Sequence, residues 1–414
     1  MIGKGSSEGF LSAEEVRRIF EEGRIKLDCA GKSLLFIIPD DTRTCPMPFL
    51  FKTVCDVFAP YVSKLGFLIA LGTHKPMSAE ALEDFLGISR EEIDKNYGNV
   101  EVFNHDWENT STFREIGTIP EEDISSITDG LFSMEVPVAL NKAVFEYDKT
   151  VILGPVFPHE VVGFSGGYKY LFPGIGEERF IGFFHWLGAV KLSSEIIGTI
   201  DTPVRDVINR AGKFLSIDIP IFSFVVHGQD IHCMYFGGPD DAWRRAAEIA
   251  EATHIRFIDR RYKSILAEAP PMYKDIWTAA KCMYKMETAV EDGGELIIYA
   301  PHVKEISFSH GEVLDEVGYH VRDYFAKQWD DFKKYPWGVL AHSTHVKGIG
   351  TFEDGKEKPR INVILATGIP EERCKKVNLG YMDPEEINPS EWDGREKEGR
   401  LYVSRAGETL YRLK

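Results

Sequence analysis

The sequence predicts an α/β fold of two domains with largely parallel sheets, and three observations support this prediction. The chain has 414 residues, more than a single hydrophobic core usually organises. Its 43% hydrophobic and 27% charged residues are an ordinary globular mixture. Apolar runs of strand length alternate with segments of helical period, as in strand–helix–strand units. Because small ligands commonly bind between domains, we expect an interdomain active-site cleft.

The predicted elements follow this alternation along the chain. The apolar runs that we interpret as strands cover residues 34–39, 65–71, 100–104, 150–155, 222–227, 264–267, 295–300, 338–342 and 362–366. The clearest helical stretches cover residues 79–85, 240–252, 277–289 and 312–325. We expect residues 380–400, rich in Pro, Glu and Asn, to form an exposed connection.

A domain boundary is predicted where a charged segment, residues 259–263, leads into a new strand. We therefore expect an N-terminal cofactor-binding and catalytic domain over residues 1–260. A C-terminal α/β domain over residues 261–414 would close the cleft, with its last residues free to pack back on either domain.

The composition also limits the partners and the compartment. A formal net charge of −17, from 65 acidic and 48 basic residues, disfavours nucleic acid as a partner. No apolar stretch approaches the roughly 20 residues of a membrane helix, and the N-terminus lacks an apolar signal core. The six cysteines show no CxxC spacing, which disfavours both a disulfide framework and a Cys-rich zinc site. We expect a cytoplasmic protein; its oligomeric state is unknown from the sequence.

The densest chemical signal is a glycine-rich segment that follows the predicted strand at residues 150–155. Ser165, Gly166 and Gly167 supply backbone N–H groups that are able to bind an anion, and Lys169 could reach a phosphate or act as an amine nucleophile. The segment lacks the Walker spacing, and taken alone it is equally compatible with a structural turn.

Two further polar segments follow predicted strands. Residues 40–43, DDTR, present carboxylates and a guanidinium, and residues 72–76, GTHKP, present the imidazole of His74. An isolated DDTR is more often a capped turn, and His185, in the aromatic run FFHW, is by itself more often a structural histidine. Strand ends that meet at one edge of a sheet make a shared site the better interpretation.

Taken together, DDTR, GTHKP, the segment HEVVGFSGGYKYLFPGIG at residues 159–176 and the downstream His185 resemble the nickel-dependent lactate racemase family. The resemblance is clear over the N-terminal two-thirds of the chain and looser in the C-terminal domain.

The resemblance implies a cofactor, the nickel-pincer nucleotide pyridinium-3,5-bisthiocarboxylic acid mononucleotide, which a thioamide tethers to Lys169. Carbon and two sulfurs of the cofactor would hold the nickel, and His185 would be the fourth ligand, a set that suits planar nickel(II). The implied contacts of the cofactor with the chain are Asp40, Asp41, Thr42, Ser165, Gly166 and Gly167.

The same resemblance implies a racemase or epimerase of small 2-hydroxy acids. His74 and His159 match the two catalytic histidines of the family, and imidazole is well suited to acid and base work near neutral pH. The α-hydrogen would leave as hydride to the cofactor and return to the opposite face. Arg43 and Lys281 match residues that hold the substrate anion. Cofactor-synthesis enzymes are implied as transient partners.

Two features depart from lactate racemase. Thr278 stands where a polar amide is expected, three residues before Lys281. The segment HSTH, with His342 and His345, has no assignable counterpart; because it follows a strand-like run, we expect the two rings not to meet at one ion. It is equally a pocket wall or a structural loop. These departures favour a hydroxy acid larger or more polar than lactate, such as a sugar acid.

Two alternatives remain at this stage. The first is a zinc- or iron-dependent hydrolase or lyase with His74, His159 and His185 as ligands. The second is a non-catalytic protein that binds the cofactor or a hydroxy acid.

Overall fold

The chain divides into two compact units in a computed structural model that describes residues 1–414. The first unit contains Met1–Phe157, Phe164–Ile181 and Arg205–Thr253, and the second contains Pro158–Gly163, Gly182–Val204 and His254–Lys414. This division differs from the single predicted boundary after residue 260, because two short segments from the middle of the chain pack with the C-terminal unit. Long-range packing of this kind leaves no mark on local sequence patterns.

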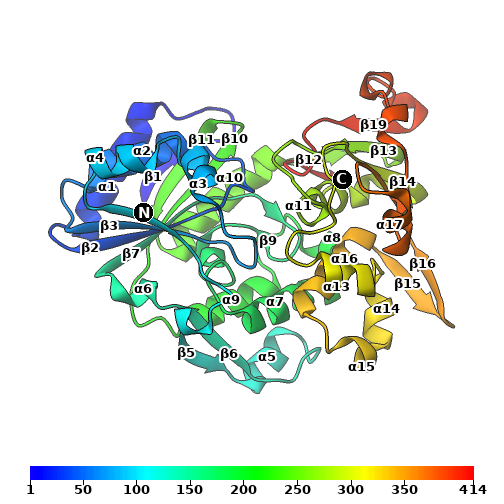
Figure 1. Cartoon of the computed structure of the whole chain (residues 1–414), viewed down its shortest axis with the longest axis horizontal. Helices are drawn as coiled ribbons and strands as arrows, with labels where there is room; N and C mark the ends of the chain where they lie inside the picture. The colour runs from blue at the N-terminus through cyan, green and yellow to red at the C-terminus, as the bar shows by residue number, and fades with distance from the viewer. The chain divides into compact units, whose positions relative to one another are not determined.

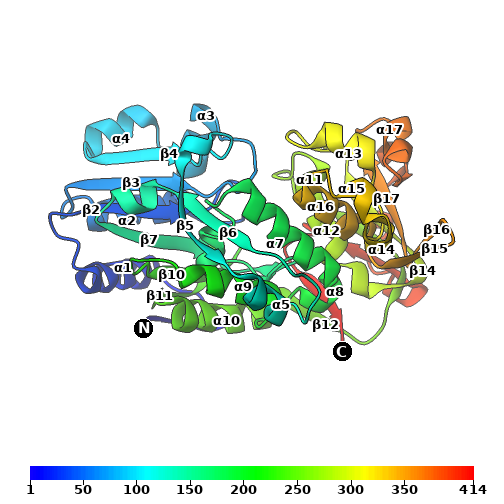
Figure 2. The ribbon, with the colours of Figure 1, turned by 90° about the horizontal axis from the view of Figure 1, so that it is seen from below.

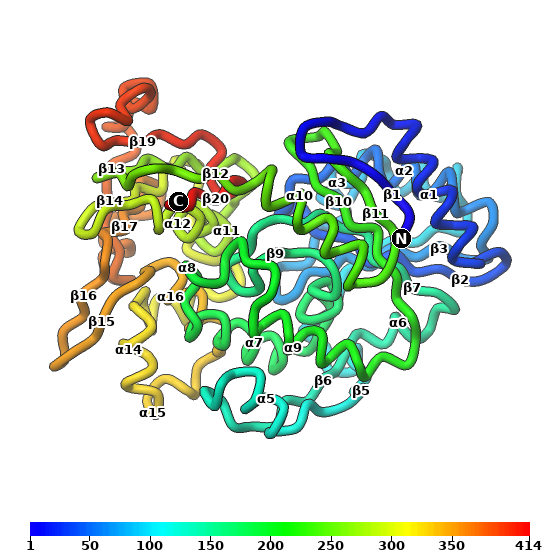
Figure 3. Tube along the Cα trace, turned by 180° about the vertical axis from the view of Figure 1, so that it is seen from behind, coloured from blue at the N-terminus to red at the C-terminus, as the bar shows by residue number.

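The first unit is built on a seven-stranded sheet in the order β4-β3-β2-β7-β10-β11-β1, of which Figure 2 labels β4 to β11. The five strands from β4 to β10 are parallel; β11 and β1 pair antiparallel at the far edge, where Figure 3 traces the N-terminal strand beside β11. The strands are β1 Ile2–Gly5, β2 Ser33–Ile38, β3 Lys64–Ile69, β4 Val100–Asn104, β7 Lys149–Pro155, β10 Ile221–His227 and β11 Asp230–Gly237.

Helices cover both faces of this sheet, so its central strands are buried and almost continuously apolar. In Figure 1, α1 (Ala13–Leu27) and α2 (Met47–Phe58) lie on one face, and α6 (Ala143–Glu146) and α9 (Pro203–Gly212) on the other. Ser12 and Glu15 form a capping box at the start of α1. Phe20 of α1 packs on Phe222 of β10 with ring centroids 4.8 Å apart.

The other elements that involve the first unit are α3 Ala79–Leu86, α4 Arg90–Asn96, β5 Phe113–Ile119, α5 Glu121–Ile127, β6 Val136–Asn141, α7 Glu178–Val190 and α10 Arg244–His254. Strands β5 and β6 form an antiparallel pair of their own. Helix α7 begins in the first unit and ends in the second. The two short strands β8 (Pro158–His159) and β9 (Gly163–Phe164) lie where the chain changes unit.

The second unit contains a five-stranded parallel sheet in the order β18-β17-β14-β13-β19. The pairs β12–β20 and β15–β16 stand apart from it. The strands are β12 Ile255–Ile258, β13 Tyr262–Glu268, β14 Val290–Ala300, β15 Gly350–Glu353, β16 Lys356–Pro359, β17 Asn362–Thr367, β18 Gly380–Tyr381, β19 Arg400–Val403 and β20 Leu410–Leu413. The C-terminal strands β19 and β20 therefore pack on the second unit.

The helices of the second unit are shorter than the sequence pattern predicts. They are α8 Ser193–Ile196, α11 Ile276–Ala279, α12 Lys281–Tyr284, α13 Gly311–Val317, α14 Arg322–Lys327, α15 Trp329–Phe332, α16 Trp337–Lys347 and α17 Glu371–Lys376. The predicted helix over residues 277–289 is broken into α11, α12 and a 3₁₀ turn. The one over 312–325 is interrupted at Gly318, whose φ of 71° ends α13.

The strand predicted over residues 338–342 is wrong, because these residues belong to helix α16. Every residue from Val339 to Val346 is buried, so the helix has no polar face. A helix that is buried all round shows no 3.6-residue period, and its short apolar run is indistinguishable from a buried strand in the sequence.

None of the helices combines the length and the apolar character that crossing a membrane requires. All six cysteines are buried and unpaired.

Candidate active site

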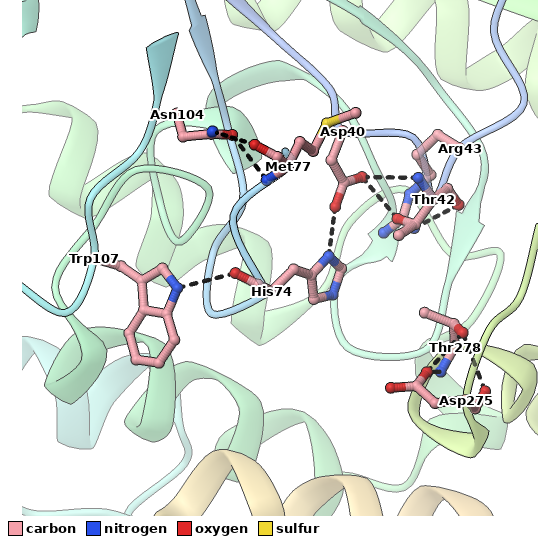
Figure 4. A network of polar contacts seen from close by, with 9 residues as sticks. All are labelled: Asp40, Thr42, Arg43, His74, Met77, Asn104, Trp107, Asp275 and Thr278. Carbon is pink, nitrogen blue, oxygen red and sulfur yellow. Dashed lines mark hydrogen bonds and ion pairs between the residues drawn. The ribbon is translucent and has the colours of Figure 1, made fainter. Parts of the chain in front are cut away.

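The ends of β2 and β3 bring together an acid and a base, as the position of DDTR and GTHKP predicted. Asp40 follows β2, His74 follows β3, and the two strands are parallel neighbours. Oδ2 of Asp40 lies 2.5 Å from Nδ1 of His74 (Figure 4). A carboxylate can only accept at this position, so Nδ1 carries the proton and Nε2 of the neutral ring is left as the basic nitrogen.

Asp40 is held as a carboxylate although it is only 5% exposed. Burial by itself would raise the pKa of Asp40, but the charge and hydrogen bond of His74 and the nearby Arg43 hold that pKa well below its usual range. The Oγ1 hydroxyl of Thr42 donates to Oδ1 at 2.7 Å, and the Thr42 N–H donates to the same oxygen at 3.3 Å. The carboxylate therefore has partners on both oxygens.

Arg43 extends this network. Its Nη1 donates to Oγ1 of Thr42 at 2.9 Å and to the Thr42 carbonyl at 3.2 Å. The guanidinium is partly buried, while Asp41 is exposed. Of the two adjacent acids, Asp40 is therefore the one that is turned into the protein.

The loop that carries His74 is fixed to the segment that carries Lys169. Gly72 adopts a φ of 59°, and its N–H donates to the carbonyl of Gly174 at 2.8 Å. The carbonyl of His74 accepts from Nε1 of Trp107 at 2.9 Å. Tyr170, the neighbour of Lys169, is partly buried, and burial of its hydroxyl with the nearby Asp40 and Cys45 raises the pKa of that hydroxyl. The three predicted segments of the first unit therefore lie close to one another.

The glycine-rich turn itself is tightly packed. Gly166 and Gly167 have φ angles of 82° and 62°, and a Cβ on Gly167 would lie 2.9 Å from the ring of Trp243. The N–H groups of both glycines make no hydrogen bond within the chain. Ser165 is held by its N–H, which donates to Phe157 at 2.8 Å. Lys169 follows in a 3₁₀ turn, Gly167–Tyr170.

Arg205 and Trp243, which the sequence analysis missed, brace this turn. Arg205 is 3% exposed; it donates to the carbonyls of Phe164 and Gly166 and lies over the ring of Trp243 at 4.0 Å. Nε1 of Trp243 donates to the Ser165 carbonyl at 2.8 Å. Burial lowers the pKa of Arg205 to about 9. No local pattern distinguishes this arginine from an exposed one on a helix.

The other predicted site residues belong to the second unit. Nδ1 of His159 accepts from the Val161 N–H at 3.2 Å, so the neutral ring carries its proton on Nε2. Oε2 of Glu160 lies 3.3 Å from the same nitrogen; it would form an ion pair only with a protonated ring, at the expense of the bond from Val161. The neutral tautomer is therefore opposite to that of His74.

His185 and Lys281 also lie in aromatic surroundings. His185, on α7, contacts Phe184 edge-on at 5.2 Å, and its neighbour Trp186 stacks on Trp329 at 5.0 Å. The ammonium of Lys281 lies 4.6 Å from the ring centre of Tyr273. The contacts of His185 and Trp186 agree with the aromatic setting predicted from FFHW.

Thr278 has a local structural role. Its hydroxyl donates to Oδ1 of Asp275 at 2.8 Å, and its N–H donates to the same oxygen at 3.0 Å (Figure 4). Asp275 thereby caps α11. The hydroxyl of Thr278 is thus hydrogen-bonded to its own helix cap.

The two histidines of HSTH lie one turn apart on α16, both buried. The ring of His342 stacks on Trp277 with centroids 4.1 Å apart and meets Tyr319 edge-on at 5.8 Å. Burial lowers the pKa of both histidines, that of His345 to about 3. The expectation that HSTH follows a strand is therefore wrong. Neither unit contains a group of three His, Cys, Asp or Glu side chains arranged to hold a metal ion.

Comparisons with known proteins find a lactate racemase N-terminal domain in this chain. The model of the lactate racemase N-terminal domain matches residues 21–196. A lactate racemase of Thermoanaerobacterium thermosaccharolyticum is 23% identical over 286 residues, which are 68% of this chain and 61% of that protein. The match thus spans about three-fifths of the relative's length.

Two solved structures share the fold along the whole chain. A crystal structure of a Thermotoga maritima protein has 31% identity and a TM-score of 0.90, and covers 98% of this chain and 99% of its own. The lactate racemase apoprotein of T. thermosaccharolyticum has 18% identity and a TM-score of 0.71, with 99% and 94% covered. The resemblance of DDTR, GTHKP and the Lys169 segment is therefore confirmed, because residues 21–196 match the lactate racemase N-terminal domain.

Proposed function

We propose that the protein is a nickel-dependent racemase or epimerase of small 2-hydroxy acids, with a nickel-pincer nucleotide tethered to Lys169. The observation that carries this proposal is the hydrogen bond between Asp40 and His74, which lies beside the Lys169 segment within the lactate racemase domain. A base on a neutral imidazole, oriented by a buried carboxylate, is what removal of a hydroxyl proton requires.

The residues of the first unit fit such a cofactor. The N–H groups of Gly166 and Gly167 have no acceptor in the chain. The buried guanidinium of Arg205 donates to the carbonyl of Gly166. An anionic phosphate would satisfy these donors. Lys169 follows directly and would form the tether. When bound, the cofactor would accept and return the α-hydrogen as hydride.

The chain's own residues would do the remaining work. Nε2 of His74 would accept the hydroxyl proton while Asp40 holds the ring and stabilises its positive charge. We therefore assign Asp40 a positioning role in place of the predicted cofactor contact. Arg43, which Thr42 ties to the same carboxylate, would bind the substrate carboxylate.

A second acid–base group would serve the opposite face of the substrate carbon. His159 is suited to this because its neutral ring carries a proton on Nε2, so that it would donate where His74 accepts. The roles of His159 as second acid–base group, His185 as nickel ligand and Lys281 as substrate contact stay predictions from the family resemblance. So does the synthesis of the cofactor by partner enzymes.

Intact-protein and peptide mass spectrometry tests the proposal. Protein produced together with the cofactor-synthesis enzymes should carry a covalent adduct on Lys169 and contain nickel, and it should interconvert the enantiomers of lactate or another 2-hydroxy acid. Protein from a host without that pathway should carry neither adduct nor activity.

Lys169→Met should abolish both adduct and activity, whereas Lys26→Met, on the exposed face of α1, should leave both unchanged. An active enzyme with an unmodified Lys169 would refute the tether. Full activity of Lys169→Met with bound zinc or iron would favour a hydrolase or lyase, and a loaded but inactive protein would indicate binding alone.

A further inference from the structure

The chain between β3 and α3, which carries His74, lies outside regular structure. Residues 72–78, which we call the His74 loop, belong to no helix or strand, and the side chain of His74 is 28% exposed. Asp40, by contrast, is buried, and Thr42 holds it independently of this loop. The geometry of the hydrogen bond between Asp40 and His74 therefore depends on what holds the His74 loop.

Two side chains at the end of β4 bind the backbone of the His74 loop (Figure 4). Oδ1 of Asn104 accepts from the Met77 N–H at 3.2 Å, and Nδ2 of Asn104 donates to the Met77 carbonyl at 2.9 Å. Nε1 of Trp107 donates to the carbonyl of His74 at 2.9 Å. We call Asn104 and Trp107 the β4 clamp. Its three hydrogen bonds supply partners that a neighbouring strand or a helical turn would otherwise supply.

The β4 clamp is itself fixed by His105, which lies between its two residues in the sequence and is fully buried. The N–H of His105 donates to the carbonyl of Ile69, the last residue of β3, at 3.2 Å. Its Nδ1 accepts from Nδ2 of Asn141 at 3.0 Å. Burial lowers the pKa of His105 to about 4, so the ring is neutral near pH 7 and can accept this bond. The clamp therefore rests on buried residues of the same unit.

Asn99, directly before β4, makes the same kind of contact at the opposite end of the strand. Its Nδ2 donates to the carbonyls of Ala59 and Val62 at 3.0 and 2.9 Å. Because β2, β3 and β4 are parallel, this end of the sheet lies away from Asp40 and His74. Asn99 and Asn104 thus bind loops in a similar way, but only the loop at Asn104 carries a candidate catalytic residue.

We propose that Asn104 and Trp107 are positioning residues for proton transfer by His74. The β4 clamp fixes the His74 loop, so that Nδ1 keeps its proton on Asp40 and Nε2 stays the basic nitrogen. This inference rests on the proposed function and adds two residues to its machinery. The clamp acts through the backbone of the loop, and a displacement of about 1 Å in a reacting group can cost about a hundredfold in rate.

Steady-state kinetics of cofactor-loaded protein on L-lactate test the β4 clamp. Trp107→Phe keeps an aromatic ring but removes the N–H that binds the His74 carbonyl. It should lower kcat by about tenfold to a hundredfold with little change in KM, because substrate binding does not depend on the tautomer of His74. Asn104→Leu acts at Met77, farther along the loop, and should lower kcat by about threefold to tenfold.

The matched control is Asn99→Leu, which also removes two hydrogen bonds between an asparagine side chain and the backbone of a loop. Asn99→Leu and Asn104→Leu should lose similar free energies of unfolding in urea, whereas Asn99→Leu should keep the kcat of the wild type. If neither Trp107→Phe nor Asn104→Leu lost more kcat than Asn99→Leu, the clamp would be structural only and the proposal would be overturned.

The tautomer of His74 provides a second measurement, which needs neither cofactor nor substrate. Side-chain ¹⁵N spectra of the apoprotein in mildly alkaline buffer, assigned with His74→Gln, should show the proton mainly on Nδ1 in the wild type and in Asn99→Leu. In Trp107→Phe part of the population should carry it on Nε2, because the ring is no longer held on the carboxylate of Asp40. The wild-type tautomer in both clamp variants would contradict the proposal.

The two measurements separate this inference from the proposed function. If the loaded wild type did not racemise L-lactate, the proposed function would fail on that substrate. The ¹⁵N spectra alone would then decide whether the β4 clamp holds His74 on Asp40.

Discussion

The buried polar atoms at the ends of β2 and β3 have hydrogen-bond partners, whereas two buried polar atoms on helix α16 have none. At the strand ends, both oxygens of Asp40 have partners, and these partners fix Thr42 and the ring of His74. On α16, His342 and His345 are equally buried but their Nε2 atoms bond to nothing. A complete network holds side chains in one geometry before a ligand binds, whereas each buried polar atom without a partner costs roughly 1–3 kcal/mol.

The largest expected effect is at the complete network. Asp40→Asn should lower kcat by roughly a hundredfold to ten-thousandfold with little change in KM, because an amide no longer fixes the tautomer of His74 or stabilises its positive charge. Steady-state kinetics of cofactor-loaded protein measure this. The control is Asp84→Asn, an exposed residue of α3. An equal loss in both variants would remove the positioning role from Asp40.

The next effect concerns acid stability. The folded pKa of His345 is about 3, below its ordinary 6.5, so between these values the unfolded chain binds a proton that the folded chain does not. Stability from this site is therefore complete above pH 6.5 and falls with pH by up to about 1.4 kcal/mol per unit down to pH 3. His345→Gln should show a flatter decline between pH 7 and pH 5 in urea unfolding. Parallel declines would mean that His345 does not titrate in this way.

A smaller effect is expected for Thr42→Val, which removes the hydroxyl between Asp40 and Arg43. Leaving Oδ1 of Asp40 with a weaker partner should cost about 1 kcal/mol of unfolding free energy at pH 7. Urea unfolding measures it, and a variant as stable as the wild type would show that the network at the strand ends is less complete than the distances indicate.

The smallest effect is expected for Tyr319→Phe in the ligand-free protein. Its hydroxyl has no partner to lose, so the variant should match the wild type or gain up to about 1 kcal/mol of unfolding free energy. Thr42→Val and Tyr319→Phe thus form a matched pair in which one hydroxyl is bonded and the other is not. If both cost the same, the contrast between the two regions would fail.

The sheet and the first half of the candidate site could be predicted from the sequence because their signals are local. Long apolar runs such as residues 34–39 are typical of strands in a parallel sheet, and polar residues directly after them indicate the active edge. The expected proximity of Asp40, His74 and the Lys169 segment is confirmed. Family motifs then supplied the chemical roles.

The features that the sequence did not predict are either buried on all sides or formed by contacts between distant segments. Helix α16 shows no period because every face is covered, so it was predicted as a strand. Arg205 and Trp243 are 38 residues apart in sequence and meet only through the fold, beneath a turn that neither one adjoins.

The sequence by itself determined the α/β class, the polar residues that follow the parallel strands, and the family motifs. Hydrophobic pattern and short motifs are properties of neighbouring residues. Only the tertiary structure decided which oxygens and nitrogens have hydrogen-bond partners. Asp40 bonds to His74, whereas the ring of His342 stacks on the indole of Trp277 and its Nε2 has no hydrogen-bond partner. Hydrogen bonding depends on contacts between distant segments, and these exist only after the chain has folded.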